Sequence, residues 1–159
     1  QWVNTMINNG ITLEELDSKI AQSIQVHNIQ PVRSYTRQEK QRGKLDVYPL
    51  GTVIPVSLNE NITFFLFALS ELDENNKAQC SERDFVDGLV QLIDSYDDRG
   101  QGFEMFLPLV GTGMSRANIQ HQEALQKIKA TFEVHRSKIK GTVNIVIYSK
   151  DSDKVSIFD

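Results

Sequence analysis

Apolar and polar residues alternate along this chain with two different periods, which predict helices and strands. Apolar residues recur at helical spacing in four stretches, residues 2–9, 13–27, 81–96 and 118–136. Apolar runs too short for buried helices predict strands at residues 47–56, 62–69, 105–110, 143–148 and 155–158. Two prolines confine the first of these to an edge, a bulge or a bent strand, whereas the run at 62–69 predicts a central strand buried on both faces and the run at 143–148 another buried strand. This order of elements predicts an α/β fold, a three-layer α/β/α sandwich with a mixed central sheet.

One apolar run leads directly into a glycine turn. Met105 to Val110 ends in Gly111-Thr112-Gly113, and the helix predicted at 118–136 follows, with Ser115 available as its cap. Ligands of open α/β sheets bind at the carboxyl ends of strands. Glycines let the backbone approach a ligand, and free N–H groups at a helix start suit a phosphate. The alternative is an ordinary turn whose glycines only permit positive φ.

Two other predicted strands end in residues that suit the same edge of the sheet. Ser70 follows the strand at 62–69, and it shares an edge with Gly111 if the two strands are parallel. Tyr148 ends the strand at 143–148, where its ring is placed either to stack on a base or to cap the core.

Length and charge narrow the possible classes of protein. The 159 residues, taken as one domain over 1–159, are enough for a self-sufficient core. The net charge of −4 does not favour binding to a nucleic-acid backbone, so no nucleic-acid partner is expected. No apolar run approaches the ~20 residues that cross a bilayer. The chain opens at Gln1 inside a predicted helix, so we expect further segments upstream.

The residues that usually carry catalysis or bind metals form no familiar pattern. His27, His121 and His135 are scattered, and none has metal-ligand spacing to a cysteine or carboxylate. The single cysteine, Cys80, has no neighbouring histidine, and Ser115 has no partner base. The Walker lysine and the Gly-x-Ser-x-Gly elbow are also absent from the sequence. We therefore predict no catalytic residue, no metal, no cofactor and no enzymatic activity.

Three short motifs carry a resemblance to a known family. The segment from Leu107 to Arg116 resembles the second phosphate-binding loop of macro domains, which cradles the diphosphate of ADP-ribose. Together with Tyr48-Pro49-Leu50-Gly51-Thr52 and Ala68-Leu69-Ser70, it is similar to the divergent macro domain of bacterial Thoeris antiphage effectors. The resemblance spans nearly the whole chain.

The resemblance implies a receptor for an ADP-ribose-type signal that a TIR-domain enzyme makes from NAD, such as histidine–ADP-ribose. In such effectors binding biases activation, with a homo-oligomer as the expected assembly. It also implies that this soluble piece is the cytoplasmic domain of a membrane-anchored bacterial inner-membrane protein. By the same resemblance Gly111 to Ser115 hold the diphosphate, Arg116 adds charge or fixes the turn, and Tyr148 flanks adenine. The predicted ligand-binding residues are Gly111, Thr112, Gly113, Met114, Ser115, Arg116, Tyr148 and Ser70.

The chain also departs from catalytic macro domains. Those rely on an early strand, an Asn-Ala-Ala-Asn type segment and a first glycine-rich loop, none of which occurs in this sequence. Asn4, Asn8 and Asn9 do not match that segment. Either the missing part lies upstream of Gln1 or the site is built differently, and an ADP-ribosyl hydrolase of macro type stays open as the alternative function.

Overall fold

The computed structural model describes residues 8, 10–112 and 119–158. The predicted helix at 2–9 falls almost entirely outside the described residues. The described helices are α2 (Leu13–Val26), α3 (Glu82–Arg99) and α4 (His121–Val134), with the short 3₁₀ helices η1 (Arg136–Lys138) and η2 (Ser149–Lys154). The described strands are β1 (Arg33–Ser34), β2 (Asp46–Val47), β3 (Val53–Asn59), β4 (Ile62–Phe67), β5 (Glu71–Leu72), β6 (Ala78–Gln79), β7 (Met105–Pro108) and β8 (Val143–Val146). The α/β class is confirmed.

Local sequence signals account for where two of the helices begin. Thr12 caps α2, and its side chain accepts from the amide of Glu15 at 3.1 Å while the Glu15 carboxylate accepts from the amide of Thr12 at 2.8 Å. Ser81 and Asp84 make the same reciprocal pair at the start of α3, at 3.1 and 2.9 Å. Both capping boxes satisfy amides that have no partner inside the helix.

The strands pair only in twos in the described part of the chain. β3 and β4 form an antiparallel hairpin, and β7 and β8 form a parallel pair; β1–β2 and β5–β6 are two further antiparallel ladders. The expected single mixed sheet is therefore not seen as one continuous ladder among the described strands. β4, predicted as a central strand buried on both faces, has no fully buried residue.

The hydrogen-bond register of the hairpin explains why β3 tolerates Pro55 inside the ladder. Ala68 and Thr52 are hydrogen-bonded across the hairpin, with the Ala68 amide donating to the Thr52 carbonyl at 2.9 Å. Hydrogen-bonded pairs alternate in an antiparallel ladder, so Pro55, opposite Phe65, falls at a position whose nitrogen faces away from β4. The missing N–H removes no bond from the hairpin, which confirms the prediction of an edge or bulged strand.

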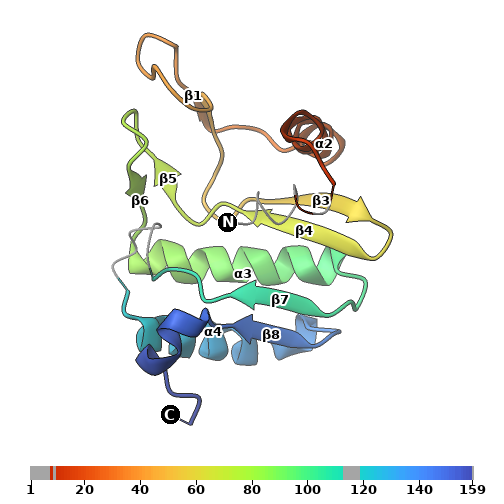
Figure 1. Cartoon of the computed structure of the whole chain (residues 1–159), viewed down its shortest axis with the longest axis vertical. Helices are drawn as coiled ribbons and strands as arrows, with labels where there is room; N and C mark the ends of the chain where they lie inside the picture. The colour runs from red at the N-terminus through yellow and green to blue at the C-terminus, as the bar shows by residue number, and fades with distance from the viewer. Residues whose placement is uncertain (1–7, 9, 113–118, 159) are drawn as a thin grey trace.

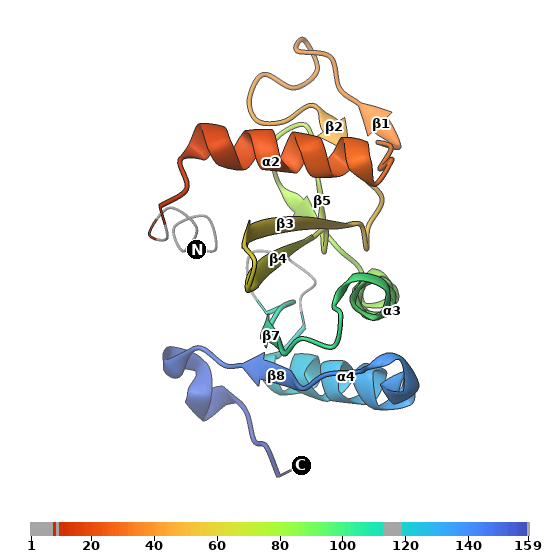
Figure 2. The ribbon, with the colours of Figure 1, turned by 90° about the vertical axis from the view of Figure 1, so that its right-hand side faces the viewer.

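Helices cover both faces of the β3–β4 hairpin (Figures 1 and 2). α2 packs on one face, where Ile11, Leu16 and Val56 are buried together. α3 lies against the opposite face and also against β7, so one core joins the two main ladders. That core consists of Val53, Phe85, Leu89, Leu92, Ile93, Leu107, Ile119, Ala124, Ile128 and Phe132.

The β7–β8 ladder is covered by helices on one face only, within the described residues. Leu107 is buried against the α3–α4 side, whereas Phe106 and Val146, which point the other way, are 64% and 45% exposed. The strand predicted at 143–148 is present as β8, but it ends at Val146 and, against the prediction of a buried strand, has no fully buried residue. The strand predicted at 155–158 was also wrong, because these residues form neither helix nor strand.

Candidate functional site

The carboxyl ends of three strands lie on the same side of the molecule. β4, β7 and β8 run in the same direction in Figure 1, so the chain leaves all three at one edge. The Leu109 amide donates to the Val146 carbonyl at 2.9 Å, which keeps the ends of β7 and β8 side by side. Ser70, Gly111 and Tyr148 follow the carboxyl ends of these three strands in sequence, on the side of an open α/β sheet where ligands usually bind.

Gly111 is glycine because α3 lies against it. Its φ is +91°, and a Cβ built on it would stand 2.6 Å from a ring carbon of Phe85, a side chain with no solvent exposure. Both observations exclude a side chain at this position. The positive φ agrees with the alternative of an ordinary turn that the sequence left open for this glycine, and the contact with Phe85 adds a packing reason that the sequence did not indicate.

The structure describes the residues on either side of the glycine loop. Gly113, Met114, Ser115 and Arg116 lie outside the described residues. At the first end the Thr112 hydroxyl donates to the Leu109 carbonyl at 3.5 Å, a weak contact. At the second end Ile119 is buried in the main core, and α4 begins at His121. The described residues that flank the loop, Gly111 and Ile119, are therefore both buried.

Tyr148 lies two residues beyond the end of β8, at the start of η2. Its carbonyl accepts from the Asp151 amide at 2.8 Å, while its side chain is 53% exposed. The sequence left two roles open for Tyr148, stacking on a base or capping the core, and this exposure does not fit a core cap. Ser70, by contrast, is half-buried between the ends of β4 and β5.

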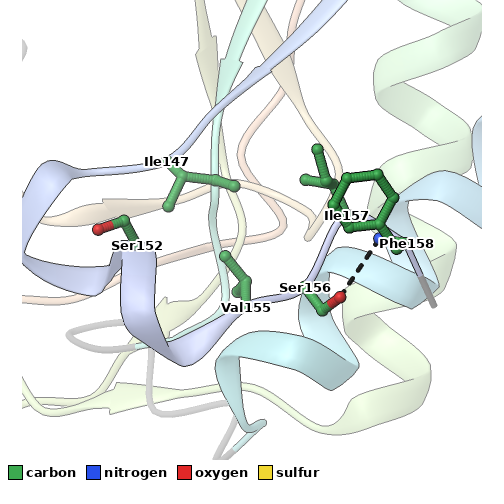
Figure 3. Close-up of a pocket in the computed structure, with 6 residues that line it drawn as sticks. All are labelled: Ile147, Ser152, Val155, Ser156, Ile157 and Phe158. Atoms are coloured by element: carbon green, nitrogen blue, oxygen red, sulfur yellow. Dashed lines mark hydrogen bonds between the residues drawn. The ribbon is translucent and has the colours of Figure 1, made fainter.

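An apolar pocket opens at Ile147, the residue that precedes Tyr148 in the chain (Figure 3). It has a volume of about 420 Å³ and lies between the end of β8, η2 and the C-terminal segment. Its lining consists of Ile147, Ser152, Val155, Ser156, Ile157 and Phe158. Inside this wall the Ser156 hydroxyl oxygen accepts from the Phe158 amide at 3.3 Å. The lining suits a mainly apolar group with a few polar atoms.

The first residues of α4 hold the C-terminal segment that forms this pocket. The Gln122 side chain donates to the Ser156 carbonyl at 3.2 Å and accepts from the Ser156 amide at 2.6 Å. The neighbouring His121 lies 3.5 Å from the Asp151 carboxylate. A hydrogen bond from Lys154, aided by the charges of Lys154 and His121, lowers the pKa of Asp151. Neither contact was predicted from the sequence, because a bond between residues 34 positions apart leaves no periodic signal. The sequence signal that could have indicated the pocket wall was the apolar side chains of Val155, Ile157 and Phe158.

The described residues offer little for covalent or metal chemistry. In residues 10–112 and 119–158 no three histidine, cysteine or acidic side chains gather as a metal site. Burial, with a smaller effect of Asp84, raises the pKa of Cys80, which disfavours the thiolate that a nucleophile needs. Among the described helices, none is both long and apolar enough to span a membrane.

Comparison with known proteins gives one family and one relative. Residues 1–148 match the family described as "Thoeris protein ThsA, Macro domain". The Thoeris protein ThsA of Bacillus amyloliquefaciens (strain Y2) is 24% identical over 151 residues, covering 92% of this chain and 48% of that protein. The chain spans about half the length of the curated relative it matches.

Proposed function

The chain belongs to the family of Thoeris ThsA macro domains, and from this premise we propose that it is the single domain through which a Thoeris effector senses an ADP-ribose-type nucleotide. The observation that carries the proposal is that Gly111, at the start of the glycine loop, follows β7, while an exposed tyrosine and an apolar pocket follow β8, its parallel neighbour. A nucleotide diphosphate has matching parts, since its phosphates suit backbone amides and its base suits an apolar wall with an aromatic ring.

In the proposed complex the backbone of Gly111 to Arg116 binds the diphosphate. Tyr148 and the pocket at residues 147–158 take the adenine, because this is the apolar part of the edge. Ser70 lies at the end of β4 on the same side and is assigned to the ribose between them. Arg116 supplies the positive charge that backbone amides lack.

The wider role of the protein is also part of the proposal. The signal is an ADP-ribose conjugate such as histidine–ADP-ribose, made from NAD by a TIR-domain enzyme. Its binding favours an active homo-oligomer of an effector that is anchored in the bacterial inner membrane by segments outside this chain, with this domain on the cytoplasmic side.

The finer architecture belongs to the same proposal. α2 and α3 already cover opposite faces of the β3–β4 hairpin, and α3 also underlies β7. We assign both ladders to one mixed sheet of a three-layer sandwich, completed by a strand that is not among the described ones.

Calorimetric titration tests the function directly. ADP-ribose and histidine–ADP-ribose are titrated into the whole chain, and the same mixtures are then assayed for breakdown of the ligand. We expect binding without turnover, tighter for the conjugate. A Gly113→Val variant should lose binding while keeping its melting temperature, since the side chain would fill the phosphate space. Turnover would assign the protein to the hydrolases instead, and wild-type affinity in the variant would refute the placement of the site.

A further inference from the structure

Gln122 binds the main chain of Ser156 with both ends of its amide. Nε2 donates to the Ser156 carbonyl at 3.2 Å, and Oε1 accepts from the Ser156 amide at 2.6 Å. This pair reproduces the two bonds that one strand residue exchanges with its partner in a sheet. The Gln122 side chain, at the start of α4, thus satisfies the backbone N–H and C=O of Ser156 as a neighbouring strand would.

The C-terminal segment depends on this contact. Residues 155–158 lie in neither helix nor strand, and Ile157 and Phe158 are 65% and 92% exposed. Among the described residues, the hydrogen bonds that join these four positions to another element are the two from Gln122. Little apolar burial is available to order such a segment, so its position depends on polar contacts.

The same segment supplies most of the pocket. Val155, Ser156, Ile157 and Phe158 are four of its six lining residues. Figure 3 shows Ile147 and Ser152 on one side of the pocket and Ile157 and Phe158 on the other. Releasing residue 156 would remove one whole wall. Upstream, η2 has its own contact to α4, through His121 and Asp151 at 3.5 Å, so Ser152 would stay in place.

We propose that Gln122 is a positioning residue for the ligand: it holds residues 155–158 as the wall that receives the apolar, base-bearing end of the nucleotide. This rests on the proposed function. Gln122 lies on the second residue of α4, the helix that follows the glycine loop. The start of α4 therefore positions the pocket wall through the side chain of Gln122.

Two substitutions separate the two hydrogen bonds. Gln122→Ala removes both. Gln122→Glu keeps an acceptor for the Ser156 amide but replaces the donor with an oxygen that faces the Ser156 carbonyl, so one bond is lost and replaced by repulsion. Gln126→Ala is the matched control, because Gln126 is the same residue type one turn further along α4 and is exposed.

The variants are compared by nuclear magnetic resonance, with amide hydrogen exchange at Ser156 and titrations of ADP-ribose and of pyrophosphate, a probe without a base. We expect Gln122→Ala to lose protection at Ser156 and to bind ADP-ribose about 10- to 30-fold more weakly, as two net hydrogen bonds imply. Its pyrophosphate affinity should be unchanged. Gln122→Glu should weaken ADP-ribose binding in the same direction, and Gln126→Ala should match the wild type.

Retained protection at Ser156 in Gln122→Ala would overturn the inference, and so would lost protection with unchanged ADP-ribose affinity. An equal loss for ADP-ribose and pyrophosphate would show general damage to the site, which also contradicts it. A wild-type chain that binds neither probe would refute the proposed function instead, while the exchange measurement would still decide whether Gln122 holds the segment.

Discussion

Replacing Gly111 with alanine tests the packing at the start of the glycine loop. The new Cβ would stand 2.6 Å from one Phe85 ring carbon and 3.2 Å from two others, and the ring has no exposed surface toward which to move. Overpacking a core costs about 1–3 kcal/mol, and an alanine at positive φ costs a further ~1–2 kcal/mol. We therefore expect Gly111→Ala to lower the free energy of unfolding by about 2–5 kcal/mol.

Urea denaturation measures this loss. With a slope of about 2 kcal/mol per molar, the midpoint should fall by about 1–2.5 M. Gly10→Ala is the matched control, because Gly10 has nearly the same φ of +90°. No atom of the described residues lies within 4 Å of the place its new Cβ would take, so this variant reports backbone strain without that clash. If Gly111→Ala is no more destabilising than Gly10→Ala, the contact with Phe85 does not restrict the loop and the reasoning is refuted.

Three further predictions concern the site and the helix starts. Tyr148→Ala should weaken ADP-ribose binding about 10-fold in calorimetry while Tyr148→Phe stays near wild type, because the 53% exposed ring rather than its hydroxyl would contact the base. If Tyr148→Ala binds ADP-ribose as tightly as the wild type, Tyr148 is not part of the site. Ser81→Ala should lower the free energy of unfolding by about 1 kcal/mol in urea denaturation, since Ser81 caps α3; an unchanged midpoint would contradict this. Hydrogen bonds from Ser81 lower the pKa of Asp84. The stability that the charged carboxylate adds is therefore present above the ordinary Asp pKa of about 3.9 and is lost as the pH falls through the lowered value. Asp84→Asn should flatten the fall in stability below about pH 4, and parallel pH curves for variant and wild type would refute the assignment.

Local signals in the sequence predicted the helices well. Thr12 with Glu15 and Ser81 with Asp84 form the capping boxes that their spacing indicates, because both partners lie within one helical turn. The glycine turn after β7 and the edge position of the proline-containing β3 were likewise readable from short stretches. These features depend on residues that are close together in the chain, so the sequence alone is enough to predict them.

Burial and long-range contacts were harder to predict. The apolar run at 62–69 reads as a central strand, but β4 pairs only with β3 among the described strands and stays half-buried. An apolar run indicates that a segment is buried, but it does not indicate which element packs against it. The bond between Gln122 and Ser156 joins a polar helix start to a polar loop, and neither stretch stands out by composition.

The place where an ADP-ribose-type ligand binds is the central claim. Chemical-shift mapping of the ¹⁵N-labelled chain during titration with ADP-ribose answers this in one measurement. We predict that the largest shifts fall on Ser70, on Gly111 to Arg116 and on residues 147–158, with the β1–β2 hairpin unaffected. Shifts gathered away from the carboxyl ends of β4, β7 and β8, or no shifts at all, would contradict the proposed site.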